Sequence, residues 1–213
     1  ATLDISPKLW YNPLLDYKIY MFSGILVIIV TLIGMMLTDL NLVREKEMGT
    51  TEQINVTPIR KYQFIIAKLL PFWIIAIFEL AFGLTLAKLV FEIPMIGSIP
   101  LVFGVAGVYL MVALGMGLLI STLTNTQQQS MFLTFFFMII FVLMSGLFTP
   151  IQSMPEWAQI VNKINPIAYF IEVMRMILLK ASTFQDIIRH FVSLLLLAVL
   201  LNALAVWRYR KVV

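Results

Sequence analysis

The sequence predicts an all-α integral membrane protein with about five transmembrane helices. Of its 213 residues, 61% are hydrophobic and 12% are charged, whereas soluble domains are about half apolar and a quarter charged. Five apolar stretches are each long enough for a helix to cross a bilayer, which takes about 20 residues. Arg and Lys residues flank these stretches, which accounts for the net charge of +4 without a nucleic-acid partner. We therefore expect one transmembrane domain across residues 1–213, in contact with membrane lipid.

A polar segment and a first span open the chain. Residues 1–18 contain two prolines and several aromatic residues, which favour an extended segment on the outer side of the membrane. Residues 19–39 form the first span, because no charged residue occurs before Asp39, which ends it.

The longest polar interval between apolar regions follows at residues 40–63, and residues this hydrophilic must lie in water. The first helix can continue to Met48, and Gly49 then interrupts it. Thr50 and Gln53 have the spacing of a capping box, so a short new helix can begin there. By composition alone, a solvated linker with paired charges is the favoured interpretation.

The second span covers residues 64–91 and carries Glu79 near its middle. An ionisable group at that depth is costly, so Glu79 is a candidate intramembrane polar site. The alternative is that Glu79 is protonated, or bonded to a neighbouring helix, for packing reasons alone.

The third and fourth spans cover residues 100–123 and 131–148. No charged residue occurs from Ile93 to Pro155, and the polar run 124–130 is where the chain must turn. Small residues recur at every fourth position within the third span, a spacing that lets helices approach closely in lipid. These candidate helix-packing residues are Ala113, Gly117 and Ser121.

Residues 149–185 predict an outer helical segment between the fourth and fifth spans. Ser153 and Glu156 have capping-box spacing and predict a short helix, which Asn165-Pro166 ends. The helix that follows is either interfacial or re-entrant. The fifth span covers residues 186–207, and residues 208–213 form a basic tail.

The distribution of basic residues favours a cytoplasmic C-terminus. With this orientation eight Arg and Lys residues lie inside and seven outside. The inner ones are denser and closer to the ends of spans, where the positive-inside rule has force. The inner set consists of Arg44, Lys46, Arg60, Lys61, Lys68, Arg208, Arg210 and Lys211.

The motifs of common enzymes are absent from the sequence. It contains no G-x-x-x-x-G-K-[ST] phosphate loop and no G-x-S-x-G nucleophile motif. With no cysteine and one histidine, a metal cage of His and Cys ligands is not expected. We expect a chain that is not an enzyme and binds no metal.

Three blocks of sequence point to one family. The polar interval has Arg44-Glu45-Lys46-Glu47-Met48-Gly49-Thr50-Thr51-Glu52, then Thr57-Pro58, then Ala67-Lys68. It resembles the first cytoplasmic loop of type-2 ABC transporter permeases, which include drug and polysaccharide exporters and have roughly R-E-[KR]-E-x-G-T-x-E there. Weaker matches occur in the family's order: Tyr11-Asn12-Pro13, Gly146-Leu-Phe-Thr-Pro150, Met154-Pro155-Glu-Trp157, Asn165-Pro166 and Arg175.

The resemblance implies the permease subunit of an ATP-driven exporter, in the inner (plasma) membrane, for an apolar or amphipathic substrate. Residues 44–55 would form a coupling helix that sits on a separate cytoplasmic ABC ATPase subunit. The expected contact residues are Arg44, Glu45, Lys46, Glu47, Gly49, Thr50 and Glu52. ATP and magnesium would bind to the ATPase, so this chain would carry no cofactor. A second permease subunit, identical or related, would complete the pathway.

This sequence departs from the family in two respects. Family members have six spans and an outer domain after the first, so five spans indicate a chain that lacks the first span and that domain. Ala181 also replaces a glycine that many members have after the basic residue.

Two other functions remain open at this stage. A non-transporting membrane scaffold could recruit a different soluble partner through residues 43–62. An ion-coupled carrier could use Glu79, although the internal repeats common in such carriers are not evident.

Overall fold

The structure is a computed structural model that describes residues 17–49, 61–93 and 95–208. All regular structure in these ranges is helical: α1 (Tyr17–Glu47), α3 (Lys61–Leu89), α4 (Ile99–Leu123), α5 (Gln127–Met144), the 3-10 turn η1 (Ile151–Ser153), α6 (Glu156–Asn162), α7 (Pro166–Lys180) and α8 (Phe184–Arg208). Among the described residues, α1, α3, α4, α5 and α8 are long and apolar enough to cross a membrane. The predicted fold class is therefore confirmed.

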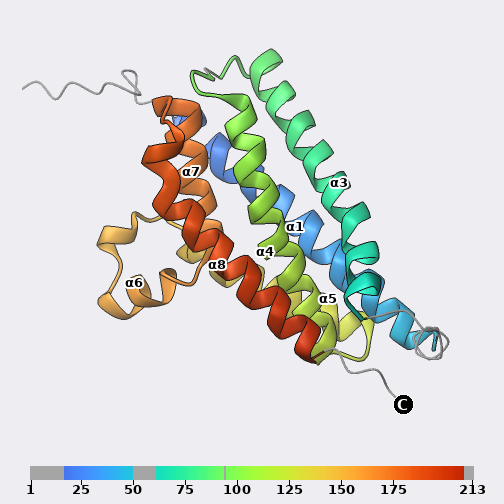
Figure 1. The fold of residues 1–213 in the computed structure, drawn as a ribbon. Helices are drawn as coiled ribbons and strands as arrows, with labels where there is room; N and C mark the ends of the chain where they lie inside the picture. The colour runs from blue at the N-terminus through green and yellow to red at the C-terminus, as the bar shows by residue number, and fades with distance from the viewer. Residues whose placement is uncertain (1–16, 50–60, 94, 209–213) are drawn as a thin grey trace, which may run out of the picture.

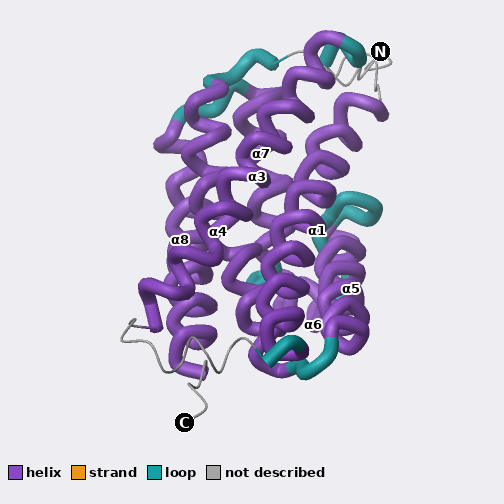
Figure 2. The backbone as a smooth tube through the Cα atoms, turned by 90° about the vertical axis from the view of Figure 1, so that its right-hand side faces the viewer, coloured by secondary structure: helices purple, strands orange, loops and turns teal. Residues whose placement is uncertain are grey.

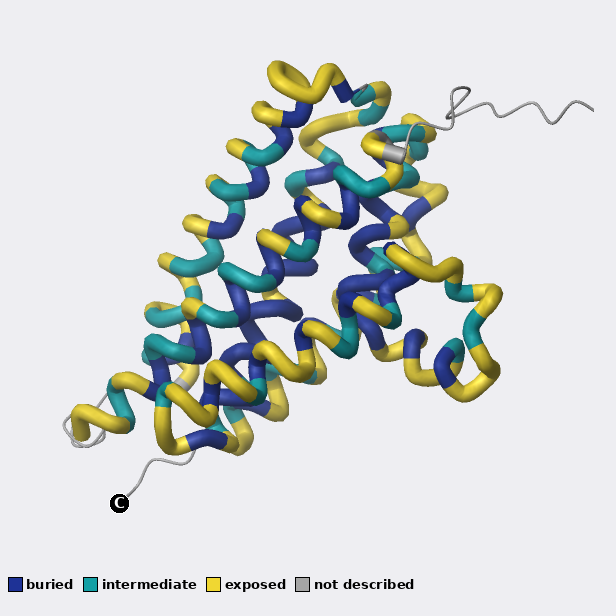
Figure 3. The backbone as a smooth tube through the Cα atoms, turned by 180° about the vertical axis from the view of Figure 1, so that it is seen from behind, coloured by how far each residue is buried: buried dark blue, intermediate teal, exposed yellow. Residues whose placement is uncertain are grey.

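Helix α4 is the centre of the bundle (Figure 1). Of the 18 residues in its most apolar stretch, 67% are buried, against 17% in the corresponding stretches of α3, α5 and α8. Its Tyr109 is fully buried, bonds Thr31 of α1 and stacks on Phe170 of α7 with 4.1 Å between ring centroids. The outer faces of the peripheral helices remain apolar and exposed (Figure 3), as expected for surfaces that meet lipid or another subunit.

Glycines allow α4 to approach its neighbours closely. A Cβ on Gly117 would lie 2.5 Å from the carbonyl oxygen of Met35, so at this point the α4 backbone lies against α1. Gly115 faces the side chain of Asn202 on α8, which donates to the carbonyl of Met111 at 2.9 Å. The predicted packing residues Ala113 and Ser121 are buried along the same helix.

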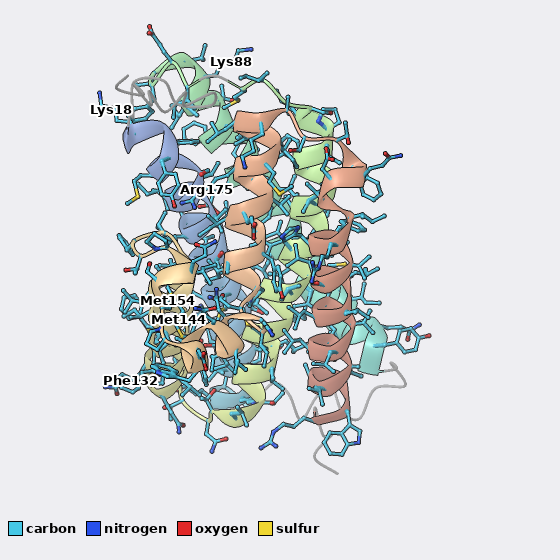
Figure 4. The ribbon with its side chains drawn as sticks, turned by 90° about the vertical axis from the view of Figure 1, so that its left-hand side faces the viewer. Lys18, Lys88, Phe132, Met144, Met154 and Arg175 are labelled. Carbon is cyan, nitrogen blue, oxygen red and sulfur yellow. The ribbon has the colours of Figure 1, made fainter. Side chains whose placement is uncertain are left out.

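The bundle has two ends, which we name after the predicted orientation. The outer end carries Lys18 and Lys88, and the inner end carries the end of α1 and of α8 (Figures 2 and 4). Met144, at the end of α5, and Met154 lie between Arg175 and Phe132 along the bundle's long axis (Figure 4). The chain therefore reverses within the depth of the bundle, and α7 returns to the outer end packed against α1, α4, α5 and α8. Helix α7 thus lies among the other helices of the bundle rather than apart from them.

The turns between α5 and α7 follow local rules, with one correction. The predicted break at Asn165-Pro166 is confirmed. Asn165 caps α7 by accepting from the N–H of Ile167 at 3.0 Å, and Pro166 takes the first helical position. Ser153 does not cap α6 as predicted: its hydroxyl donates to the carbonyl of Pro150 at 2.8 Å within η1. Pro155 stands at the start of α6 instead, and no side chain caps that helix.

The first helix continues past Asp39 to Glu47, close to the predicted limit at Met48, and hydrogen bonds from α5 satisfy the buried Asp39 carboxylate. The fourth span differs from its predicted bounds. Helix α5 occupies 127–144 rather than 131–148. The Thr126 side chain caps its start by accepting from the N–H of Gln129 at 3.3 Å. Past its end, Gly146 has φ +80, a left-handed conformation that ends the helix.

Candidate functional site at the inner end of α1

The candidate site is the last turn of α1, where the apolar helix becomes polar without a break. Leu42 and Val43 are still buried, whereas Arg44 and Glu47 are exposed. Gly49 then adopts φ +70 and its N–H bonds to the carbonyl of Lys46 at 3.1 Å. A glycine in the left-handed conformation is a common helix ending. The interruption predicted at Gly49 is thus confirmed.

Glu45 connects the end of α1 to α3. Its carboxylate forms an ion pair with the Nζ of Lys68. Both side chains are partly exposed, at 16% and 30%, so the pair adds about 0–1 kcal/mol of stability. Its main effect is to set the position of α3 relative to α1.

Lys46 connects α1 to the end of α4. Its Nζ donates to the backbone carbonyl of Ser121 and to that of Thr124 at 3.2 Å. The last carbonyls of a helix have no partner within the helix and carry the negative end of its dipole. A lysine ammonium is therefore suited to bind them.

Glu47 connects α1 to the start of α5. Its carboxylate accepts from the backbone N–H of Gln127 at 2.8 Å and from that residue's side-chain amide. A helix start presents free N–H groups and the positive end of the dipole, which a carboxylate satisfies. Three consecutive residues of α1 thus each bind a different helix.

Asp39 forms a second, buried connection between α1 and α5. Its two carboxylate oxygens accept from the hydroxyls of Ser130 and Thr134, the latter at 2.6 Å. The Ser130 hydroxyl also lies 2.9 Å from that of Thr124. Sequence reasoning missed this cluster. The available signal was the spacing of Ser130 and Thr134, which places two hydroxyls on one face of an apolar helix.

The predicted site residues fall into three groups. Arg44, Glu45, Lys46, Glu47 and Gly49 lie together at the inner end, and Ser121 joins them through its carbonyl. Thr50 and Glu52 lie outside the described residues.

Glu79 is separate, within α3, where neither of its buried carboxylate oxygens has a hydrogen-bond partner among the described residues. Among all residues that the structure describes, no three His, Asp or Glu side chains are grouped so that they could hold a metal ion.

The fold is a bundle of five membrane-spanning helices in which the polar inner end of α1 binds three of the others. This defines the transmembrane domain of a multi-pass membrane protein. Residues 1–207 match the ABC-2 family transporter protein profile, and the chain belongs to this family. The predicted relationship to type-2 ABC permeases is confirmed.

Several relatives are named as permeases. The chain is 34% identical over 202 residues to the probable multidrug ABC transporter permease YbhR of Escherichia coli K12, covering 95% of this chain and 55% of YbhR. It is 30% identical over 181 residues to the probable multidrug ABC transporter permease YbhS, covering 83% and 47%. It is 27% identical over 214 residues to the inner membrane transport permease YhhJ, covering 99% and 57%. The latter two are also from E. coli K12, and the chain spans about half the length of these relatives.

Proposed function

We propose that this chain is the transmembrane domain of a permease subunit in an ATP-driven ABC exporter of the inner (plasma) membrane, with a cytoplasmic C-terminus. A separate cytoplasmic ATPase subunit would bind ATP and magnesium and drive the export of an apolar or amphipathic substrate. One observation carries the proposal: Glu45, Lys46 and Glu47 tie the end of α1 to α3, α4 and α5 in turn.

The three contacts suggest how a soluble partner moves the spans. The segment that follows Gly49 begins where α1 stops, so a force applied to that segment acts directly on the last turn of α1. Because Glu45, Lys46 and Glu47 bind three other helices, displacement of this turn moves their inner ends together. These residues therefore act within the membrane subunit, while Arg44, Gly49, Thr50 and Glu52 are assigned to the ATPase contact.

The exposed apolar faces support a second permease subunit. Helices α3, α5 and α8 present large apolar side chains outward, including Phe78, Phe132 and Leu196. A pathway for an apolar substrate needs walls of this chemistry on both sides, which two copies or two related chains supply.

The test uses the full-length protein together with its ATPase in proteoliposomes. Gly49→Pro removes the left-handed turn, and Glu52→Arg reverses a charge assigned to the contact. Both variants are expected to insert in the membrane and to hydrolyse ATP without exporting substrate. Lys88→Gln, at the outer end, is the control and keeps normal coupling. Normal coupling in both inner variants would overturn the proposal.

Co-purification separates the exporter from a membrane scaffold. If the ATPase co-purifies with the permease, and substitutions at residues 44–52 abolish this co-purification, the result supports the exporter. A partner that is not an ATPase would favour the scaffold instead.

A further inference from the structure

A cavity of about 710 Å³ opens between the first turns of α1, the turn after α5, and α7. Arg175, which lines it, lies in the outer half of the bundle (Figure 4). Ligand sites are commonly about 300–1,000 Å³ in volume. Apolar side chains such as Ile151, Ile171 and Leu179 form much of the wall. The charged residues of α7 that line it are Glu172, Arg175 and Lys180. Such a lining suits a molecule with an apolar part and an anionic part.

The guanidinium of Arg175 is held in a defined orientation. It lies over the ring of Tyr20, with its Cζ 3.6 Å from the ring centroid, and its Nη1 donates to the Tyr20 hydroxyl at 2.9 Å. The Tyr20 hydroxyl in turn donates to the carbonyl of Gly146 at 3.3 Å. Contacts from α1 and from the turn after α5 therefore preorganise this α7 side chain.

The other edge of the same guanidinium has no partner. The Nε and Nη2 atoms of Arg175 are buried and make no hydrogen bond among the described residues. These two donors lie side by side and match the two oxygens of a carboxylate or phosphate. Buried donors without partners are costly, so an oxyanion at this edge would satisfy both at once.

The surroundings carry an excess of positive charge. A second cavity of about 510 Å³ shares Glu172 and His190 with the first and adds Lys163 and Arg189. Among the described residues, Glu172 is the one acidic side chain that lines either cavity, and it accepts from the Nε2 of His190 at 3.2 Å. The basic groups thus outnumber the carboxylate, and the local field attracts anions.

We propose that this cavity binds the anionic head of an amphiphile, a phosphate or carboxylate held by the Nε–Nη2 edge of Arg175 and by Lys180, with the apolar chain along Ile151, Ile171 and Leu179. Entry requires a small displacement of the side chains that cover this edge. Binding can be measured without ATP or the ATPase, so its test does not depend on the proposed export function.

The experiment measures binding to the purified full-length protein in a neutral detergent. The probes are dioctanoyl phosphatidylglycerol, dioctanoyl phosphatidylcholine and inorganic phosphate, and native mass spectrometry gives the bound fractions. We expect the anionic lipid to bind more tightly than the zwitterionic lipid. Arg175→Gln should weaken its binding by about tenfold to hundredfold, the range that corresponds to a lost charge-assisted hydrogen bond. Lys88→Gln removes one outer positive charge away from this cavity and should leave binding unchanged.

Two further variants keep the test decisive. Arg175→Lys retains the charge but loses the two-pronged edge, so it should recover only part of the affinity. Lys180→Gln leaves the Tyr20–Arg175 contact intact and serves if Arg175→Gln does not fold. Unchanged binding in Lys180→Gln and in a folded Arg175 variant, or equal binding of the two lipids, would overturn the proposal. Inorganic phosphate binding as tightly as the anionic lipid would retain the anion site but refute the amphiphile.

Discussion

Asp39 of α1 accepts a hydrogen bond from Ser130 of α5, and the same carboxylate also accepts from Thr134. Removing the carboxylate leaves two buried hydroxyls without their acceptor. We expect Asp39→Ala to cost about 2–4 kcal/mol, since hydrogen bonds to a charged group contribute about 1.5–3 kcal/mol each and their losses are not additive. Thermal unfolding in detergent measures this. Asp39→Asn keeps one good acceptor, so its stability should lie between that of the unchanged protein and that of Asp39→Ala. Equal stability of all three proteins would contradict the cluster's role.

The approach of Gly117 to Met35 predicts strong intolerance of a side chain. Gly117→Ala places a methyl group against a backbone carbonyl that cannot rotate away, and should cost about 1–3 kcal/mol, the usual range for overpacking. Gly104, on the same helix, is the matched control, because a Cβ added there meets nothing within 4 Å. Gly104→Ala should raise stability by about 0.5–1 kcal/mol through helix propensity. The two Gly→Ala changes should therefore shift the unfolding temperature in opposite directions.

Ala181 occupies a position that favours glycine. It follows the last residue of α7 with φ 51 and ψ 34, and the N–H groups of Ala181 and Ser182 both bond to the carbonyl of Met176. A left-handed conformation costs an L-residue about 1–2 kcal/mol. Ala181→Gly should stabilise the protein by about 1 kcal/mol, whereas Ala203→Gly within the exposed part of α8 should destabilise it by about the same amount. A loss of stability in Ala181→Gly would show that the left-handed conformation of Ala181 does not destabilise the protein.

The Glu172–His190 contact predicts a pH dependence on the acid side. The hydrogen bond from His190 is the largest influence and lowers the pKa of the Glu172 carboxyl; Lys180 and Arg175 lower it further, and partial burial opposes them. A carboxyl whose pKa is lower in the folded state contributes stability above its ordinary pKa, and this is lost as the pH falls through the lowered value. We expect the unfolding temperature to decline below about pH 4.3, the ordinary glutamate pKa, and less steeply in Glu172→Gln. Parallel curves for the two proteins would refute the contact.

Glu79 provides a test of ion-coupled transport. Its carboxylate oxygens are buried without partners among the described residues, so Glu79→Gln removes an ionisable group and breaks no described hydrogen bond. In an ATP-driven exporter, transport should persist in this variant and should cease on ATP depletion. Transport that follows a proton gradient and stops in Glu79→Gln would favour the carrier.

The lengths of the apolar stretches and the helix-breaking residues between them made most of the helices predictable. Uncharged stretches of sufficient length had to be spans, and Gly49 and Asn165-Pro166 acted as the sequence indicated. The packing of α7 among four other helices was not predictable, because an amphipathic segment can pack equally well on a membrane surface or among helices. Only the contacts with other helices distinguish the two.

Partners across helices were the least predictable part of the candidate site. Glu45, Lys46 and Glu47 could be singled out as a charged run, but their spacing carries no information about Lys68, Thr124 or Gln127. Asp39 shows the same limit more sharply. A charge at the end of an apolar run marks a membrane boundary in most sequences, and only the hydroxyls of Ser130 and Thr134 make it a buried residue of the bundle.

Helix α1 has 31 residues and no break, so it acts as a lever about 46 Å long, at about 1.5 Å per residue. A tilt of about 5° around its middle displaces each end by about 2 Å in opposite directions, given that length. A shift of this size exceeds the tolerance of a hydrogen bond, whose donor–acceptor distance varies over about 0.5 Å. Tyr20 lies near the outer end of α1, in contact with Arg175. A movement at Glu47 would therefore widen or narrow the gap between Tyr20 and α7. The width of the outer cavity would then depend on the position of the inner end of the same helix.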